Sequence, residues 1–408
     1  MEKKMKKKII CLTALLILSC MMLSSCITQM FGDMGITQPP ETTNRPGIGD
    51  VTTAPETNSA NNTPVFGSKP SYAGVKLSDH IKVDYKNIKI EVDALPPKVT
   101  DQVINGELNA LIDYYVTNYG FKCDAETVKE GTVEEWDFVE ISFVGKIDGV
   151  AFQGGTSTSN AWMIVNDNAS GYIPGFASGI IGAKVGEMVE VPVTFPTNYN
   201  EALAGKDAIF EITVYSKKTY TVTDAVVSEL TGGDYKNVAD FMTYYKEYLT
   251  DLYESNLLDQ VSDLLVEALS EKATVYSYPN EQFLYYYNSN VAYMTSMAEK
   301  LGMSYEDYMT SVGETDDVLR QKAQDAVRDD MAIYYVLEAE GKTYTDEDYQ
   351  KALEYYVNYY NSQGYNYDKA SVEQLFEYYY YPGYLRYQLN LEKAIQILFE
   401  NAEIVEKK

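Results

Sequence analysis

The sequence has few residues of several types, and each shortage excludes a class of site. A single histidine, His80, stands among 408 residues. This excludes a metal site built from several histidines and a catalytic triad with a choice of histidine bases. Basic residues are scarce, because 33 Lys and Arg face 60 Asp and Glu and the formal charge is −27. Since a nucleic-acid partner needs its phosphates neutralised by Lys and Arg, the composition argues against nucleic acid.

The apolar run near the start of the chain is too short for a membrane span. It covers Ile9 to Leu23, which is 15 residues, and follows five lysines within residues 3–8. A spanning helix needs about 20 apolar residues. A basic stretch followed by a shorter apolar core is typical of a signal peptide, which we expect at 1–25.

The run ends in Leu23-Ser24-Ser25-Cys26, which resembles the bacterial lipobox. The resemblance implies that Cys26 is diacylated and becomes the new N-terminus. We therefore expect an extracytoplasmic protein that is lipid-anchored to the cell membrane of a bacterium. The alternatives are a plain signal peptide, a signal anchor, or lipidation at Cys20. Cleavage before Cys26 would remove five Lys and one Glu, which lowers the formal charge from −27 to −31.

Lipidation of Cys26 would leave Cys123 as the only free thiol, because the other two cysteines lie in the signal peptide. No intramolecular disulfide could then form, and we expect Cys123 to be a small buried apolar residue. Residues 26–74 are predicted to be the lipidated Cys and a disordered tether. Six of the 13 prolines fall there among Thr, Asn, Gly and Ser, a composition that cannot bury enough apolar area to fold.

Residues 75–134 predict a lead-in strand and a helix that pack on a helical domain. Apolar residues alternate over 81–92, and Pro96-Pro97 ends that strand. Thr100 is the predicted N-cap of a helix that ends at Gly120.

Short alternating strands with Gly-rich turns follow from Trp136. We predict strands over 139–145, 150–152, 162–165, 188–195 and 209–214, and one short helix over 177–181. Asp148-Gly149 is a hairpin signal. The pattern indicates a twisted antiparallel sheet around one short helix.

This segment resembles the FKBP-type peptidyl-prolyl isomerase domain, in its trigger factor version. The resemblance rests on an ordered set of motifs: Phe143-Val144-Gly145, Asp148-Gly149, Phe152-Gln153-Gly154-Gly155, Tyr172-Ile173-Pro174-Gly175-Phe176, Gly182-Ala183-Lys184-Val185-Gly186-Glu187, Val193-Thr194-Phe195-Pro196, Tyr199 and Leu203-Ala204-Gly205-Lys206. It implies an FKBP domain at 135–217 and isomerisation of X-Pro bonds. That reaction needs no metal and no cofactor, so we expect none.

The resemblance also implies which residues form the catalytic set: Phe143, Phe152, Trp162, Ile173, Phe176, Tyr199 and Phe210. Phe143 and Phe210 would form walls, Phe176 the floor, and Ile173 would offer its backbone N–H. Two features depart from the family. Gln153 stands where the family has an acidic residue. The loop from Gly154 to Trp162 is about two residues longer than in the family, so the alignment of Trp162 with the family's aromatic position depends on where the extra residues lie.

From 218 to 408 the Gly content drops and helical periodicity predominates. We predict helices over 249–269, 283–294, 318–337 and 352–360, and a last helix that ends near Leu398. The stretches Thr343–Asp348 and Leu391–Ala402 resemble the trigger factor chaperone domain. The chain is therefore predicted to be α+β: an FKBP-like sheet inserted before an all-α chaperone domain of the trigger factor and SurA type.

Tyrosine is the one residue type in marked excess, and 30 of the 38 Tyr lie in 218–408. Adjacent helical positions point about 100° apart, so runs such as Tyr378–Tyr381 cannot lie wholly in a core. Exposed Tyr would suit binding of unfolded clients, whereas the simpler interpretation is a core in which Tyr replaces Leu and Phe.

The resemblance implies a foldase whose partners are unfolded or nascent exported polypeptides with X-Pro bonds. We find no basic ribosome-binding loop, and the acidic surface would repel ribosomal RNA, so no ribosome is expected. The alternatives are a catalytically silent holdase and a lipoprotein receptor or adhesion module.

Overall fold

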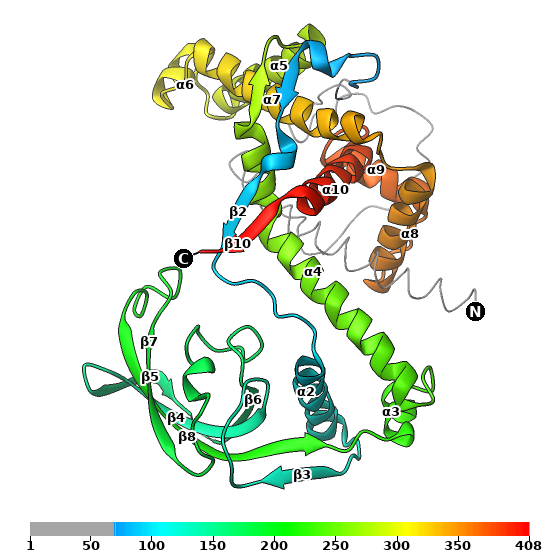
Figure 1. The fold of residues 1–408 in the computed structure, drawn as a ribbon. Coiled ribbons are helices and arrows are strands. Elements are labelled where there is room, and N and C mark those ends of the chain that lie inside the picture. The colour runs from blue at the N-terminus through cyan, green and yellow to red at the C-terminus, as the bar shows by residue number, and fades with distance from the viewer. Residues whose placement is uncertain (1–68, 70, 158, 408) are drawn as a thin grey trace. The chain divides into compact units, whose positions relative to one another are not determined.

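The structure is a computed structural model that describes residues 69, 71–157 and 159–407. The predicted signal peptide, Cys26 and nearly all of the predicted tether lie outside the described residues. Contacts divide the chain into two compact units (Figure 1). The sheet unit is Pro96–Glu254. The helical unit comprises the described residues up to Leu95 and those from Ser255 onward.

The sheet unit contains one six-stranded antiparallel sheet. Its strands are β3 (Ala125–Val128), β4 (Phe138–Ile147), β5 (Val150–Thr156), β6 (Ala161–Ile164), β7 (Met188–Thr194) and β8 (Asp207–Tyr220). The order is β3-β8-β4-β5, with β6 also paired to β4 and β7 to β8. Alternate residues of β8, from Ala208 to Val214, are buried, because successive side chains of a strand point to opposite faces.

The predicted FKBP-like sheet is thus confirmed, including its hairpin. Asp148 and Gly149 both have positive φ, at 51° and 77°, as the two-residue turn between β4 and β5 requires. The predicted short helix after Phe176 is one 3₁₀ turn, η3 (Ser178–Ile180).

Three helices accompany the sheet in this unit: α2 (Asp101–Tyr119), α3 (Asp224–Leu230) and the first half of α4 (Val238–Glu271). Helix α2 begins and ends as predicted. The Val103 N–H donates to Thr100 Oγ1 at 3.4 Å, and Gly120 has a φ of 67°. Ile104, Leu108 and Ile112 of α2 are buried with Tyr245 and Leu249 of α4.

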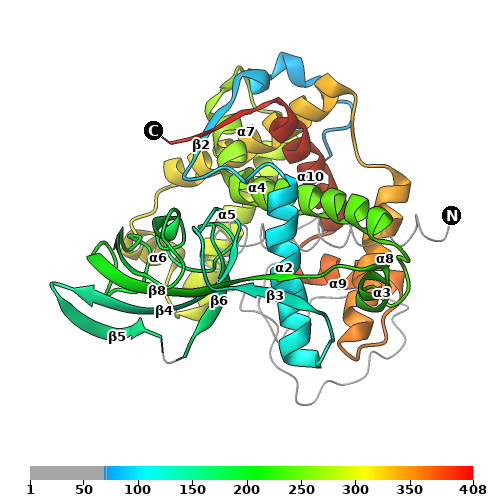
Figure 2. The ribbon, with the colours of Figure 1, turned by 60° about the horizontal axis from the view of Figure 1, so that its bottom comes forward.

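The helical unit is formed by the second half of α4 and by α5 (Asn280–Lys300), α6 (Tyr305–Ser311), α7 (Asp316–Glu340), α8 (Asp346–Ser362), α9 (Lys369–Tyr379) and α10 (Tyr384–Asn401). Two 3₁₀ turns, η1 (Leu77–Asp79) and η2 (Tyr85–Asn87), belong to it. So do two small sheets, in which β1 (Ile81–Val83) pairs antiparallel with β9 (Ala273–Val275) and β2 (Lys89–Val92) pairs parallel with β10 (Glu403–Glu406). Figure 2 shows β2 and α10 from a second direction.

The boundaries of the units differ from the predicted ones. The segment 75–134 is divided at Leu95, because its strands pair with β9 and β10 of the helical unit while α2 packs in the sheet unit. Residues 218–254, predicted to belong to the helical domain, lie in the sheet unit, where α3 and α4 cover α2. The short elements α3, α6, α9, β3, β9 and β10 were not predicted.

No helix in the described part of the chain is long and apolar enough to cross a bilayer.

Candidate active site on the sheet unit

Three of the predicted site residues meet edge to face in the core of the sheet. The ring centroids of Phe143 and Phe176 are 5.2 Å apart, those of Phe143 and Phe210 5.8 Å, and those of Phe176 and Phe210 5.0 Å. Their interplanar angles of 67° to 84° match the preferred geometry of aromatic pairs. Phe176 is 1 % exposed, whereas Phe143 is half-buried, so the cluster reaches the surface at Phe143.

A second group of rings extends this cluster. Phe152 on β5 packs at 6.0 Å from Phe210 and at 5.8 Å from Phe195, and Phe195 lies 5.0 Å from Tyr199. Tyr199 is 43 % exposed, so its ring lies at the solvent-facing edge of this group. We call Phe143, Phe152, Phe176, Phe195 and Phe210 the aromatic cluster.

Glycines make room for these rings. A Cβ on Gly145 would lie 2.6 Å from Phe210 Cε1, and one on Gly155 would lie 2.6 Å from Phe152 Cζ. Real Cβ atoms do not approach carbon so closely, so both strands need glycine where the rings lie against the backbone.

The loop between β6 and η3 carries Tyr172, Ile173 and Phe176 past the cluster. Tyr172 stacks on Phe176 with ring centroids 4.3 Å apart, and burial raises the pKa of its hydroxyl. The Ile173 side chain packs on the same core. In the part of the chain that the structure describes, the Ile173 N–H donates to no protein acceptor, so it is free for a ligand carbonyl.

Asp167 holds this loop in place. Its carboxylate accepts hydrogen bonds from the backbone N–H groups of Gly175 (3.0 Å), Ala177 (3.1 Å) and Ser178 (2.9 Å), and from the Ser178 hydroxyl at 2.6 Å. Four bonds to one carboxylate fix the backbone on both sides of Phe176.

Trp162 does not join the aromatic cluster. It stacks on Phe138 with centroids 5.2 Å apart, and Lys218 Nζ lies 3.7 Å from its ring centroid. Its neighbour Met163 is buried in the core that contains the cluster. Adjacent residues of a strand point to opposite faces of the sheet. Since Met163 points to the face with the aromatic cluster, Trp162 points to the other face. The prediction of Trp162 as a site residue is therefore not supported by its position.

Sequence reasoning missed three residues of this region: Tyr172, Phe195 and Asp167. Tyr172 and Phe195 stood within the quoted motifs but were not assigned to the site. Asp167 had no local signal beyond its place in a polar turn, since its four partners lie eight to eleven residues later.

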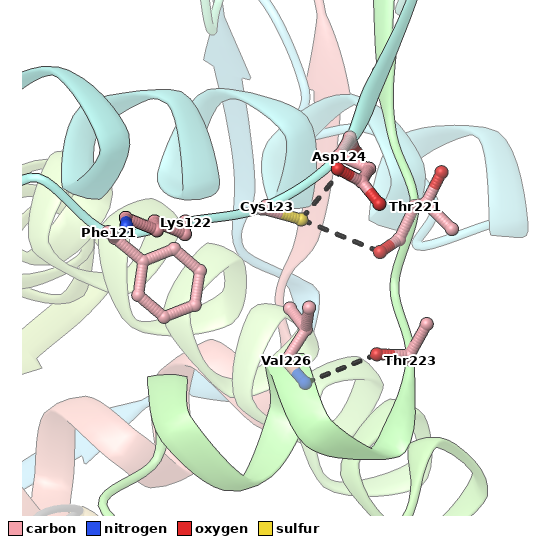
Figure 3. A pocket seen from close by; sticks show the side chains of 7 residues that line it. All are labelled: Phe121, Lys122, Cys123, Asp124, Thr221, Thr223 and Val226. Atoms are coloured by element: carbon pink, nitrogen blue, oxygen red, sulfur yellow. Dashed lines mark hydrogen bonds between the residues drawn. The ribbon is translucent and has the colours of Figure 1, made fainter.

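A separate hollow lies where α2 leads into β3, lined by Phe121, Lys122, Cys123, Asp124, Thr221, Thr223 and Val226 (Figure 3). The half-buried Cys123 thiol faces the Thr221 and Asp124 carbonyl oxygens, at 3.5 and 3.7 Å. Burial, reinforced by the Asp124 charge, raises its pKa. Cys123 is therefore a poor nucleophile. Among the described residues, no group of three or more His, Cys, Asp or Glu could hold a metal ion.

Comparison with known proteins agrees with this geometry. Residues 129–215 match the family model of FKBP-type peptidyl-prolyl cis-trans isomerase. The chain is similar to a trigger factor of Halothermothrix orenii, with 32 % identity over 284 residues that cover 66 % of this chain and 62 % of the relative. Trigger factors of Streptococcus pneumoniae and Streptococcus pyogenes are 27 % and 29 % identical over 329 residues, covering 79 % of this chain and 72 % of each relative.

One solved structure, described as "Promiscuous Substrate Recognition in Folding and Assembly Activities of the Trigger Factor Chaperone", is 14 % identical and covers 78 % of this chain and 72 % of that chain. The TM-score between the two structures is 0.35. The chain spans less than two thirds of the length of the Halothermothrix relative. Residues 129–215 thus form an FKBP-type domain, and the chain around this domain is similar in sequence to trigger factors.

Proposed function

We propose that the protein is a peptidyl-prolyl cis-trans isomerase and chaperone that assists the folding of exported polypeptides. The observation that supports the isomerase most directly is the aromatic cluster within the matched residues. Beside it lies the backbone N–H of Ile173, which donates to no acceptor among the described residues. One short loop carries both the Ile173 N–H and Phe176 of the cluster, since Phe176 follows Ile173 by three residues.

The chemistry suits these residue types. Rotation about an X-Pro bond has a barrier of about 18–20 kcal/mol because the amide is resonance-stabilised. Half-buried rings such as Phe143 and Phe152 would replace water around the amide and disfavour its charge-separated form. The Ile173 N–H would hold a substrate carbonyl while the bond turns.

A protease-coupled prolyl-peptide assay tests this activity. We expect residues 27–408 to accelerate isomerisation and Phe152→Ala to lower kcat/KM roughly tenfold, about 1.4 kcal/mol of transition-state stabilisation. Trp162→Phe is the matched control, because it also alters a half-buried aromatic ring of the same sheet, but on the opposite face. It should leave kcat/KM unchanged.

The outcomes separate the candidates. If the unaltered chain gave no acceleration, the isomerase proposal would fail, and suppression of aggregation by the same chain would then support a holdase. If Trp162→Phe lowered activity and Phe152→Ala did not, the assignment of the site to the aromatic cluster would be wrong.

The chaperone proposal is supported by exposed tyrosines on and beside α8 and α9 of the helical unit. Tyr378 is 66 % exposed, Tyr380 43 % and Tyr365 37 %. Tyr offers large contact area at a low entropic cost and keeps a polar tip, which suits weak binding of unfolded chains.

Tyr378→Ser tests this surface. We expect it to weaken suppression of aggregation about twofold to fivefold, since burial of one aromatic side chain contributes on the order of 1 kcal/mol at an interface. Tyr276→Ser is the control, because Tyr276 is 59 % exposed but follows β9 elsewhere in the unit. Equal loss in both variants would contradict a defined client surface.

We further propose that the protein is lipid-anchored outside the cytoplasm through Cys26. This rests on the sequence alone, where a basic stretch and a short apolar core precede Leu23-Ser24-Ser25-Cys26. Labelling of the protein with a radioactive fatty acid, lost in Cys26→Ala and kept in Cys20→Ala, would support the anchor. Labelling that persisted in Cys26→Ala would overturn it.

A further inference from the structure

The helical unit contains a buried ion pair surrounded by tyrosine rings. Lys69 Nζ lies 2.8 Å from Asp330 Oδ1, and 12 % and 4 % of the two side chains are exposed. The same Nζ lies 3.5 Å from the ring centroid of Tyr387, 5.4 Å from that of Tyr286 and 5.9 Å from that of Tyr381. We call Asp330 and these three tyrosines the ammonium cage.

Helices supply three of the four cage residues, and Tyr381 lies in the turn between α9 and α10. Asp330 belongs to α7, Tyr286 to α5 and Tyr387 to α10. The Tyr286 hydroxyl donates to Asp330 Oδ2 at 2.6 Å. Burial and the Asp330 charge raise the pKa of both Tyr286 and Tyr387 well above the usual value, so both remain neutral. Without Lys69, a buried carboxylate would face aromatic rings and lack a counter-charge, an arrangement that selects a cation.

Lys69 reaches the cage from a segment that belongs to no helix or strand. Two further contacts hold this segment: Gln282 Nε2 donates to the Ser71 carbonyl at 2.9 Å, and the Tyr72 ring stacks on Tyr334 with centroids 4.9 Å apart. We call Lys69, Ser71 and Tyr72 the strap. The strap thus makes three contacts: the Lys69 ammonium in the cage, the Ser71 carbonyl on the Gln282 amide, and the Tyr72 ring on Tyr334. An extended peptide bound to a helical surface makes contacts of these kinds.

The fit of the strap is incomplete. The Tyr72 hydroxyl is buried and has no hydrogen-bond partner among the described residues. A buried hydroxyl without a partner costs stability, so this contact is weaker than the burial of its ring suggests. Because the strap belongs to no helix or strand, its release would break none of the elements that form the cage.

We propose that the ammonium cage and the adjoining face of Gln282 and Tyr334 form a binding site for extended polypeptides. The recognised segment would carry a lysine and, three residues later, an aromatic residue, and the strap would be a resident competitor for that site. The chain's large excess of acidic residues favours cationic segments. The proposal does not depend on isomerase activity, so the two can fail separately.

The test compares peptide binding by the full chain and by its Lys69→Gln variant. The probe is fluorescently labelled Lys-Ala-Ser-Tyr with blocked ends, and the matched peptide has norleucine in place of Lys. We expect Lys69→Gln to bind the lysine peptide about tenfold or more tightly than the unaltered chain, because a tethered competitor reduces the apparent affinity by the fraction of sites left open. The norleucine peptide should show no such gain, and addition of Asp330→Asn should abolish it.

Lys76→Gln is the control, because it removes an exposed lysine only a few residues away, where the side chain is 71 % exposed and pairs with Asp79. It should leave binding unchanged. A folded Lys69→Gln chain that binds both peptides equally would overturn the proposal. If Lys69→Gln does not fold, hydrogen exchange on the unaltered chain decides. Excess lysine peptide should speed exchange at the Val75 N–H, which donates to the Tyr72 carbonyl at 3.1 Å. Unchanged exchange would also overturn it.

Discussion

At the scale of single residues, position on the strand decides which aromatic side chains can act together. Phe143 and Phe210 face the same core because β4 and β8 pair in a register that places Phe143 opposite Ile212 and Gly145 opposite Phe210. Trp162 is aromatic, as the site requires, but it lies outside the aromatic cluster because it is one position along β6 from the residue that faces the cluster. Asp167 then fixes the loop that carries Phe176, through bonds that no local pattern predicts.

The residue-scale prediction concerns Asp167. Asp167→Asn keeps the shape but replaces one acceptor oxygen with an amide donor, so at least one backbone N–H near Phe176 loses its partner. We expect unfolding free energy to fall by about 1–3 kcal/mol and kcat/KM to fall as well, because Ile173 and Phe176 lose their anchor. Urea denaturation and the isomerase assay measure the two effects.

Asp207→Asn is the matched control, since Asp207 accepts a single exposed side-chain bond from the Thr194 hydroxyl at 2.7 Å. It should change neither quantity by much. Equal effects of the two substitutions would count against an anchoring role for Asp167.

At the scale of elements, the last strand of the described chain pairs with a strand that precedes the sheet unit in sequence. Strand β10 pairs with β2 over four residues, from Glu403 opposite Lys89 to Glu406 opposite Val92. The Glu403 N–H donates to the Ile88 carbonyl at 2.9 Å, and Ile404 packs on the core that contains Ile88 and Leu398. A strand of four residues far from its partner in sequence has no pattern strong enough to predict it.

Truncation after Ala402 tests the contribution of β10. It removes the ladder and the Ile404 contact, and we expect the helical unit to lose about 2–4 kcal/mol of unfolding free energy. Truncation after Glu406 keeps the strand and is the control. The role given to β10 would be wrong if both truncations had the same urea midpoint.

At the scale of the whole molecule, the tyrosine excess divides between surface and core. Tyr334 and Tyr360 belong to the helical unit, and burial is the main cause that raises the pKa of each to about 12. Burial disfavours the ionised form of each hydroxyl, so the pKa of each tyrosine is higher in the folded chain than the value of 10.0 expected in the unfolded chain. Their contribution to stability is complete below pH 10.0 and is lost as the pH rises toward 12.

We therefore expect the helical signal in circular dichroism to fall between about pH 10 and pH 12, together with the rise of tyrosinate absorbance. Tyr334→Phe with Tyr360→Phe removes two of the ionising groups and should move the loss of helix to higher pH. A transition at the same pH in both chains would show that these two tyrosines do not control it.

Elements with local signals were predictable from the amino-acid sequence. The caps at Thr100 and Gly120, the Asp148-Gly149 hairpin and the alternation along β8 each depend on neighbours in the chain, and the structure confirms them. The grouping of Phe143, Phe152, Phe176 and Phe210 came from the family resemblance and not from periodicity, and in the structure these four rings pack against one another.

Features that depend on pairing between distant parts of the chain were not predictable from local patterns. The face of Trp162, the division of the lead-in between two units and the pairing of β10 with β2 all follow from register or long-range packing. The buried contact between Lys69 and Asp330 joins residues 261 positions apart. Such contacts arise because residues far apart in sequence come together only when the whole chain has folded. A short window of sequence does not contain both partners.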